Sequence, residues 1–499
     1  MRAGQIRLVL ADEAATQRLG EDIAMALRLG DVLLLKGALG AGKSTLARAV
    51  IRTLADDAGL EVPSPTFTLV QAYDTRVPIR HFDLYRLSSP DELEELGLEE
   101  ALQDAATLVE WPERAEGRFP AGAMTVELTH TGTRREATIT GVGPTFDRIK
   151  RSLAIRKMLA DAGWGGARRT HLTGDASART YETASLPGEP TRIIMNSPRL
   201  VLGPPVRDGR PYAIIAHTAQ TVAAFAGVGG ALRANGVTVP EIYAADIENG
   251  LLLIEHLGAE AFLERGEPVA ERYAAAAELL AFMHGKSWPD EMPVAEAARH
   301  VLPPFDRDAM MIEVDLLVDW YVPYVSGHAA AQSLRQEFSR RWNDALNRME
   351  ETETSILLRD YHSPNLIWRH DKAGFDRLGV IDFQDAMRGP TAYDVASLAM
   401  DARVTIPPEI EASTISAYCD AREKSGSFDR PVFDLAYATM AAQRNSKILG
   451  IFVRLDRRDG KPQYLKLLRR IRDYLRRALA HPDLAALREL YIAEGFIDA

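Results

Sequence analysis

Short apolar runs separated by polar turns are the commonest pattern along the chain. The longest, residues 32–35 and 251–254, have the length of strands and fall far short of the roughly 18 residues that a membrane-spanning helix needs. Residues 43–54 and 146–162 instead repeat apolar side chains at the helical period. We therefore expect strands and helices to alternate in the first part of the chain, as in an α/β domain.

A break in this pattern lies near residue 145. Strands predicted at 124–130 and 136–142 precede it, and the helix at 146–162 follows it. Farther along, helical patterns such as 431–455 and 464–480 alternate with short turns. The pattern predicts an N-terminal domain at 1–147 and a C-terminal domain at 148–499.

Charge and cysteine content narrow the functional classes. The chain has 499 residues and a formal net charge of −11, and residues 1–149 hold 23 acidic against 16 basic side chains. A cationic nucleic-acid binder would have the opposite balance.

The single cysteine, Cys419, cannot form an internal disulfide and is expected to pack in a helix. Without a recognisable signal peptide, the chain is expected to be cytoplasmic, with no membrane partner.

Residues 37–44, GALGAGKS, match the Gly-x4-Gly-Lys-Ser pattern of a phosphate-binding loop. The loop lies between a predicted strand at 31–36 and a predicted helix at 43–54, which is the required context. Glycines let backbone N–H groups wrap around phosphate oxygens, and the helix N-terminus adds a positive dipole end. Lys43 supplies a charge to the outer phosphates of ATP, and Ser44 offers a hydroxyl to Mg²⁺.

Two carboxylates follow predicted strands in the same domain. Residues 77–82 lead to Asp83, and residues 106–109 lead to Glu110. Either side chain could hold Mg²⁺ or orient an attacking water molecule. By pattern alone, both could equally be ordinary carboxylates at strand ends.

The first domain resembles the TsaE family, the small ATPase of bacterial tRNA threonylcarbamoyladenosine synthesis. The resemblance covers about residues 5–140 and is carried by four stretches, 40–45, 64–70, 81–87 and 108–112. It implies a P-loop fold with Mg²⁺ at Ser44 and Glu110, and a catalytic role for Asp83 and Glu110. The implied nucleotide contacts are Gly40, Ala41, Gly42, Lys43, Ser44, Thr45, Thr66 and Trp111. Trp111 could equally be a core side chain, and Thr16 and Gly20 fall where the family's first helix approaches the base.

The TsaE resemblance also implies partners. The family works with two related subunits, one of which transfers the threonylcarbamoyl group to adenosine 37 of tRNA. A TsaE subunit would therefore meet tRNA only indirectly, through the complex. The acidic charge of residues 1–149 agrees with a protein-binding subunit better than with a direct tRNA binder.

The second domain contains the residue set of a phosphotransfer site. Asp360 and Asn365 stand five residues apart after an apolar run, and residues 378–383 read as a strand that carries Asp382. Kinases use one aspartate to accept the hydroxyl proton, an asparagine to hold Mg²⁺ and a second aspartate to bridge Mg²⁺ to the phosphates. The three residues have the right order for these roles, although a polar turn followed by an unrelated strand would look similar.

Upstream, residues 172–181 could form a hairpin over the ATP phosphates, with Gly174 and Ser177 at its turn. The next predicted strand, 191–196, lacks the lysine that kinases usually carry there. Arg192 is its only cation and is the predicted substitute in the nucleotide site, together with the backbone of the hairpin turn.

Residues 150–490 resemble the aminoglycoside phosphotransferase-like kinases, an α+β bilobal fold that shares the protein-kinase core. Within them the segment is similar to the cell-wall amino-sugar kinases, which phosphorylate N-acetylmuramate and N-acetylglucosamine at the anomeric hydroxyl. The stretches that carry this likeness are 359–365, 381–386, 389–394 and 443–450.

This second resemblance implies an N-lobe at about 165–258 and a C-lobe at about 259–499. It makes Asp360 the catalytic base, and Asn365 and Asp382 the metal ligands. Residues 255–258 become the hinge, whose backbone at Glu255 and Leu257 would meet adenine. The resemblance makes Asp394 a structural residue. Gln384 and Asp385 either face the sugar or belong to a solvated turn.

The favoured interpretation is a fusion of two ATP-using enzymes. One alternative makes the second domain a module that binds a nucleotide without transfer, but such a module would be expected to lose one of Asp360, Asn365 and Asp382. The other makes it an aminoglycoside, choline or homoserine kinase. Aminoglycosides are polycations and need an acidic pocket, whereas residues 469–477 are rich in arginine.

Overall fold

The computed structural model describes the whole chain except residues 1–3, 133, 173–178, 296–297, 427 and 499. The chain divides into two compact units. The first comprises residues 1–196, 243–246 and 251–254, and the second comprises 197–242, 247–250 and 255–499. Within the described ranges, no helix is both long and apolar enough to span a bilayer.

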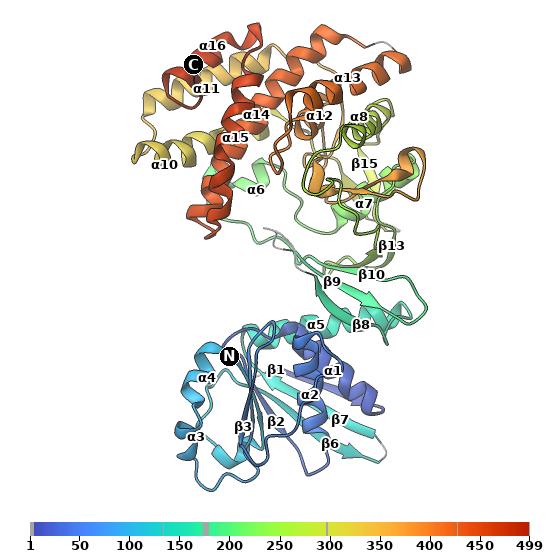
Figure 1. The fold of residues 1–499 in the computed structure, drawn as a ribbon, viewed down its shortest axis with the longest axis vertical. Helices are drawn as coiled ribbons and strands as arrows, with labels where there is room; N and C mark the ends of the chain where they lie inside the picture. The colour runs from blue at the N-terminus through green and yellow to red at the C-terminus, as the bar shows by residue number, and fades with distance from the viewer. Residues whose placement is uncertain (1–3, 133, 173–178, 296–297, 427, 499) are drawn as a thin grey trace. The chain divides into compact units, whose positions relative to one another are not determined.

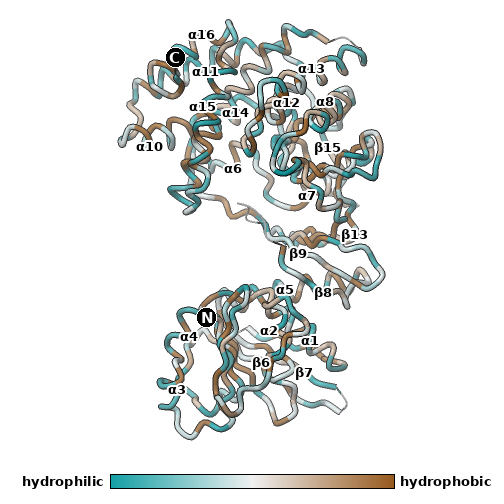
Figure 2. The backbone as a smooth tube through the Cα atoms, in the orientation of Figure 1, coloured by the Kyte–Doolittle hydropathy of each residue, from teal (hydrophilic) through white to brown (hydrophobic). Residues whose placement is uncertain are grey.

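A seven-stranded sheet organises the first unit, in the order β1-β7-β6-β2-β5-β4-β3 (Figure 1). Its strands are β1 (Gly4–Leu10), β2 (Val32–Lys36), β3 (Val70–Tyr73), β4 (Ile79–Asp83), β5 (Ala106–Glu110), β6 (Met124–Thr131) and β7 (Arg134–Gly141). β2 runs parallel to β5 and β6, and β4 runs parallel to β5. Parallel strands buried on both faces need nearly continuous apolar runs, and the central strands are accordingly brown in Figure 2.

Helices cover the two faces of this sheet. Leu108 of β5 packs in one hydrophobic cluster with α1 (Glu13–Ala26) and α2 (Lys43–Ala55). The next residue, Val109, packs in a second cluster with α3 (Glu92–Glu95) and α4 (Leu98–Asp104). Because successive strand residues point to opposite faces, the two clusters lie on opposite sides of the sheet. The P-loop architecture expected from the sequence is confirmed.

The first unit continues past residue 147 because one helix belongs to two cores. Ile149 of α5 (Pro144–Asp161) packs in the cluster of the seven-stranded sheet, whereas Ile155 and Leu159 pack in a separate cluster. That second cluster includes Ile194 and Leu253 from a five-stranded sheet of order β13-β14-β10-β9-β8. Its strands are β8 (Arg168–Leu172), β9 (Thr180–Ser185), β10 (Arg192–Asn196), β13 (Ile242–Asp246) and β14 (Leu251–Glu255).

Buried ion pairs join α1 to this smaller sheet. The Arg169 guanidinium, on β8, lies 2.7 Å from Asp22 Oδ1 and 2.7 Å from Glu182 Oε2. Arg156 of α5 pairs with Asp22 at 2.9 Å and also binds Glu21, whose other oxygen accepts the Arg169 backbone N–H at 2.6 Å. We call these five residues the α1–β8 ion network.

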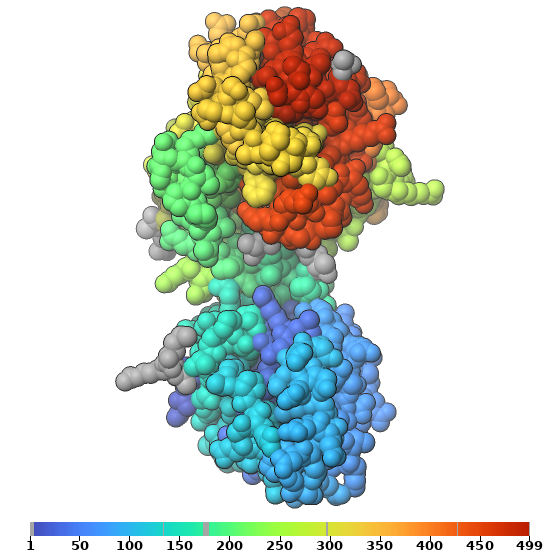
Figure 3. Space-filling view, turned by 90° about the vertical axis from the view of Figure 1, so that its left-hand side faces the viewer, coloured from blue at the N-terminus to red at the C-terminus, as the bar shows by residue number. Residues whose placement is uncertain are grey.

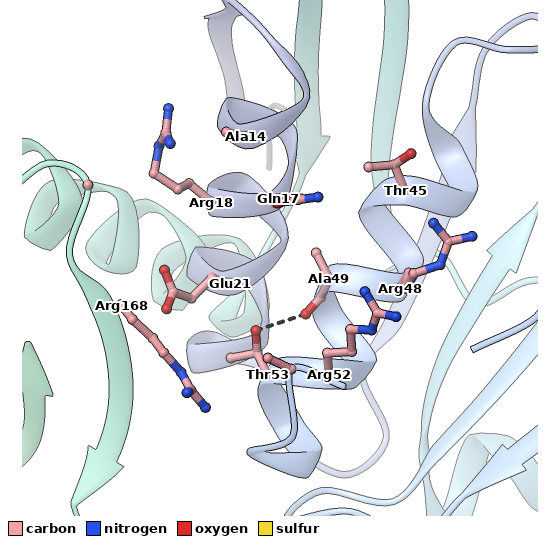
Figure 4. A pocket seen from close by; sticks show the side chains of 12 residues that line it. Ala14, Gln17, Arg18, Glu21, Thr45, Arg48, Ala49, Arg52, Thr53 and Arg168 are labelled. Carbon is pink, nitrogen blue, oxygen red and sulfur yellow. Dashed lines mark hydrogen bonds between the residues drawn. The ribbon is translucent and has the colours of Figure 1, made fainter. Parts of the chain in front are cut away.

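A pocket of about 300 Å³ lies beside that network, between α1, α2 and the start of β8. Figure 4 shows Arg18 and Arg168 on one side of it and Arg48 and Arg52 on the other, pointing away from the first pair. Arg48 and Arg52 each donate Nε to a backbone carbonyl oxygen. Because the guanidinium groups do not converge, we assign this pocket no ligand.

The second unit is mostly helical. Its longer helices are α7 (Ala223–Ala234), α8 (Ala270–His284), α9 (Arg307–Leu316), α11 (Gln332–Asn347), α12 (Ala392–Ala399), α13 (Pro408–Ser425), α14 (Arg430–Arg457), α15 (Leu468–Ala478) and α16 (Ala485–Ala493). α14 packs against α9, α12 and α15 and is the central helix. Figures 1 and 3 both place α11 beside α16, where Trp342 Nε1 donates to Tyr491 Oη at 3.1 Å.

Four two-stranded antiparallel sheets complete the described part of the second unit. Two of them pair β17 (Thr354–Leu357) with β20 (Met387–Pro390), and β18 (Leu366–Trp368) with β19 (Leu378–Val380). The other two pair β11 (Pro205–Arg207) with β12 (Arg210–Pro211), and β15 (Glu291–Pro293) with β16 (Arg299–Val301). The strand expected at 378–383 therefore ends earlier, because Asp382 has a left-handed φ of +59° that a strand does not allow. The helix expected at 464–480 begins as a 3₁₀ segment, Pro462–Leu467, before α15. Cys419 is buried on α13, as expected.

Candidate active sites

The segment between β2 and α2 forms a phosphate-binding loop. Gly40 and Gly42 have φ angles of +79° and +108°, which residues with side chains rarely adopt, so the turn needs glycine at both positions. Lys43 begins α2, and its Nζ donates to the carbonyl oxygens of Gly37 and Ala38 at 2.8 and 3.0 Å. Burial lowers the pKa of Lys43, and the carboxylates of Glu110, Glu113 and Asp83 oppose this shift.

A pocket of about 390 Å³ opens beside this loop. It is lined by Leu39, Gly40, Gly42, Lys43, Ser44, Thr45, Ser64, Thr66, Asp83, Tyr85, Glu110, Trp111 and Arg135. Of the residues predicted to contact the nucleotide in this domain, Ala41 alone is not among them. Its side chain is buried in the sheet core instead.

Glu110 lies between a hydroxyl and an imidazole. Ser44 Oγ donates to Glu110 Oε2 at 2.8 Å, and Oε1 lies 3.0 Å from His81 Nε2. A hydroxyl and a carboxylate in contact are hard oxygen ligands that fit Mg²⁺. Sequence reasoning missed His81, which fixes the carboxylate from a site that is 1% exposed. The available signal was its position two residues before Asp83, on the same face of β4.

Asp83 lies beside Glu110 because β4 and β5 are parallel and pair these two residues directly. Its Oδ2 accepts hydrogen bonds from Ser64 Oγ at 2.6 Å and from Thr66 Oγ1 at 2.8 Å. The segment that bears Thr66 is thereby tied to the strand ends. Both carboxylates and the threonine line one pocket with the phosphate loop, as an ATP-hydrolysing site requires.

Trp111 covers the phosphate-loop lysine. Its ring centroid lies 3.6 Å from Lys43 Nζ, within cation–π range, and 5.1 Å from the ring of Tyr85. The residue has a φ of +58°, so the chain turns sharply directly after Glu110. Trp111 lines the pocket and also packs, partly buried, against the cluster that contains Val109, so its role in binding the nucleotide stays a prediction.

In the second unit, the loop that carries Asp360 is held by another aspartate. Asp394, at the start of α12, accepts the backbone N–H groups of Leu358 and of Arg359, the latter at 2.9 Å. Burial raises the pKa of Asp394 to about 7. Burial also tends to raise the pKa of Asp360, but surrounding cations outweigh it and lower that pKa below its ordinary value. Asp360 is therefore ionised at neutral pH, as a general base must be.

The β18–β19 hairpin brings the two predicted metal ligands together. Asn365 immediately precedes β18, Asp382 follows β19, and the antiparallel pairing places both at one end of the hairpin. Asn365 Nδ2 donates to the Asp360 carbonyl oxygen at 2.8 Å, and Gln384 Nε2 donates to Asp382 Oδ1 at 2.9 Å. An amide oxygen and a carboxylate at one edge form a donor set that suits Mg²⁺.

Gln384 and Asp385 have internal partners. Gln384 holds Asp382, and Asp385 Oδ1 accepts the Ala219 backbone N–H at 2.7 Å. Gln384 is buried rather than in a solvated turn, and its Oε1 has no hydrogen-bond partner among the described residues. A role of Gln384 or Asp385 in facing the sugar stays a prediction.

Behind Asp360 lies a buried polar cluster that sequence reasoning did not assign. Glu313 of α9 binds Arg359, and it lies 2.7 Å from Lys447 Nζ and 3.0 Å from Gln443 Nε2. Lys447 Nζ is also 3.3 Å from Tyr393 Oη. Gln443 and Lys447 belong to the 443–450 stretch that suggested the kinase family, and their spacing of four residues places them on one face of α14.

The other residues of the kinase domain that were predicted to bind ATP are placed as follows. Gly174 and Ser177 lie outside the described residues. The Arg192 guanidinium stacks 4.0 Å from the Trp164 ring and 3.9 Å from the Tyr243 ring. Glu255 ends β14, and the Leu257 side chain packs on Gly379 of β19. Roles for Arg192, Glu255 and Leu257 in binding ATP stay predictions.

Comparisons with known proteins agree with this division. The family model described as "Phosphotransferase enzyme family" matches residues 171–435. An N-acetylmuramate/N-acetylglucosamine kinase from Caulobacter vibrioides is 35% identical over 353 residues, which are 68% of this chain and 95% of that protein. The chain belongs to the phosphotransferase enzyme family. A second such kinase, from Pseudomonas aeruginosa, is 33% identical over 67% of this chain and 92% of its own length.

The N-terminal part of this phosphotransferase is a TsaE domain. The model of the threonylcarbamoyl adenosine biosynthesis protein TsaE matches residues 10–137. A TsaE protein from Rickettsia felis is 44% identical over 107 residues, which are 21% of this chain and 62% of that protein. The chain is thus an ATP-using enzyme with a TsaE domain fused to a kinase domain, as the sequence predicted.

Proposed function

We propose that the chain is bifunctional. Its kinase domain transfers phosphate from ATP to the anomeric hydroxyl of N-acetylmuramate or N-acetylglucosamine, as in cell-wall recycling. Its TsaE domain hydrolyses ATP within the machinery that forms threonylcarbamoyladenosine at position 37 of tRNA. The observation that carries the kinase half is the match over 95% of an amino-sugar kinase, together with Asp360, Asn365 and Asp382 around one hairpin end.

In the kinase, Asp360 accepts the proton of the attacking hydroxyl. An anomeric hydroxyl is more acidic than an ordinary alcohol, so an ionised aspartate is a sufficient base. Asp394 positions the base by binding the two backbone N–H groups that precede it. Asn365 and Asp382 would hold Mg²⁺, which supplies neutralisation of phosphate charge when it is bound.

In the TsaE domain, the phosphate loop binds ATP, and Ser44 and Glu110 would hold Mg²⁺. Asp83 orients the attacking water, and its contacts to Ser64 and Thr66 link that role to the segment at the pocket edge. The domain acts on two related partner subunits and meets tRNA only through them. Both reactions use ATP, which supports a cytoplasmic location.

The proposed function is tested in the full-length chain with two assays. Lys43→Ala should abolish ATP turnover in the presence of the partner subunits, because the outer phosphates lose their cation, while amino-sugar phosphorylation continues. The wild-type TsaE activity should be nearly idle without the partners. Full turnover without partners, or loss of sugar phosphorylation in folded Lys43→Ala, would contradict the scheme. Phosphorylation of aminoglycosides, choline or homoserine in place of amino sugars would identify another kinase class.

A further inference from the structure

One buried cation near the proposed kinase base forms no ion pair with any described residue. Arg444, on α14, is 4% exposed, and its Nη1 has no hydrogen-bond partner in the described part of the chain. Within that part, no carboxylate lies within 4.0 Å of its guanidinium. Burying an unpaired charge costs several kcal/mol, so arginines with this little exposure are normally paired.

Other buried or half-buried arginines of the same unit show the usual arrangement. Each of Arg422, Arg472 and Arg477 also has one buried nitrogen without a partner, but another nitrogen of the same guanidinium pairs with a carboxylate. Arg422 binds Glu353, Arg472 lies 2.9 Å from Asp498, and Arg477 binds Glu411. Arg444 differs from them because its whole guanidinium lacks such a partner among the described residues.

The carboxylates around Arg444 are already engaged. Glu313 is bound by Arg359, Lys447 and Gln443, and Asp394 holds two backbone N–H groups. Asp360 lies close enough for the charge of Arg444 to lower its pKa, yet beyond ion-pair distance. Arg444 therefore lies near the base, on α14, without an ion-pair or hydrogen-bond partner among the described residues.

The two candidate acceptors differ in one group that would compensate this charge. N-acetylmuramate carries a lactyl ether that ends in a carboxylate, and N-acetylglucosamine has a hydroxyl at that position. With the anomeric hydroxyl against Asp360, the lactyl group lies several ångströms away on the same ring, which agrees with an arginine near the base but not in contact with it.

We propose that Arg444 binds the carboxylate of N-acetylmuramate and sets the preference of the kinase for this sugar over N-acetylglucosamine. This inference rests on the proposed kinase function. The bond is a charge-assisted one in a largely buried site, where such contacts contribute most. Arg444 is then a specificity-determining residue, distinct from the residues that hold ATP.

The test compares kcat and KM for both sugars in full-length wild-type and Arg444→Gln proteins. The variant should lose roughly 10- to 100-fold in kcat/KM for N-acetylmuramate, mainly through KM, because a charge-assisted hydrogen bond is removed. Its loss for N-acetylglucosamine should be at least tenfold smaller. Arg422→Gln is the matched control, since it also removes a buried arginine of this unit, and it should leave the ratio between the sugars unchanged.

A substrate change gives a second measurement that needs no variant. The methyl ester of N-acetylmuramate lacks the charge and adds one methyl group to the lactyl arm, so wild-type enzyme should use it as poorly as Arg444→Gln uses the acid. Equal loss for both sugars in the variant, or equal use of acid and ester by the wild type, would overturn the role of Arg444. A wild-type chain that phosphorylates neither sugar would instead refute the proposed kinase function.

Discussion

Asp360 and Asp382 are both carboxylates near one hairpin end, but their surroundings differ. Asp360 follows Arg359 and lies among cations that keep it ionised, whereas Asp382 has a left-handed backbone and is bound by Gln384. Backbone conformations of this kind cost about 1–3 kcal/mol and are typical of functional sites. At the scale of single residues, these two environments fit the different roles that we propose for Asp360 and Asp382.

We predict that Asp360→Asn lowers kcat for the amino sugar by roughly 10²- to 10⁴-fold, the usual contribution of a general base. ATP affinity should stay close to that of the wild type, because Asn365 and Asp382 remain. The paired variant Asp382→Ala should weaken Mg²⁺-dependent ATP binding as well as turnover. Steady-state kinetics and a separate nucleotide-binding titration distinguish the two outcomes. Near-normal turnover of Asp360→Asn would remove Asp360 from the role of base.

At the scale of single residues, the sequence predicted most of the residues proposed to act in catalysis, but not the side chains that hold them in place. The spacing of Asp360 and Asn365 is local, so it could be read from the chain. His81 and Glu313 were missed because each acts through a partner far away in sequence, Glu110 in one case and Lys447 in the other. The position of His81 on the Asp83 face of β4 was a local signal, but neighbouring residues do not show which distant side chain a buried histidine or glutamate contacts.

At the scale of elements, the packing of α14 explains a glycine in the middle of a helix. A Cβ at Gly450 would lie 2.2 Å from the carbonyl oxygen of Leu316, the last residue of α9. Gly230 on α7 is the opposite case, since a Cβ there would meet nothing within 4 Å. Both glycines lie inside helices, where alanine is intrinsically better by about 1 kcal/mol.

We predict opposite signs for alanine at these two positions. Gly450→Ala should lower the free energy of unfolding by roughly 1–3 kcal/mol, because forced overpacking against backbone outweighs the gain in helix propensity. Gly230→Ala should raise it by up to about 1 kcal/mol. Urea denaturation of the full-length variants measures both. A stabilised Gly450→Ala protein would mean that α9 and α14 are not in close contact.

At the scale of the whole molecule, the α1–β8 ion network connects the TsaE domain to the first sheet of the kinase domain. The Arg169 side chain is fully buried, whereas neighbouring Arg168 forms its ion pair with Asp56 at the surface, with 54% of its side chain exposed. Removing the partner of a buried charge strongly destabilises a protein, whereas an exposed ion pair contributes little to the free energy of unfolding. Together with the shared helix α5, the network makes residues 1–196 part of one compact unit.

We predict that Arg169→Met destabilises the full-length chain by about 3–5 kcal/mol, because Glu182 and Asp22 lose a buried cation. Arg168→Met, the adjacent control, should change stability by no more than about 1 kcal/mol. Thermal and urea unfolding of the two variants provide the comparison. Similar effects at both positions would show that the network contributes no more than a surface ion pair.

The sequence by itself determined several of the strands, the phosphate loop and the Asp360–Asn365 spacing, because backbone preferences and loop geometry depend on neighbouring residues. It also determined both family resemblances, which need only motifs in order. The tertiary structure alone decided that α5 belongs to two cores and that His81 fixes Glu110. It also decided that Arg444 forms no ion pair with the residues that the structure describes. Burial and charge pairing are sums over residues far apart in the chain, so they exist only once the chain is folded.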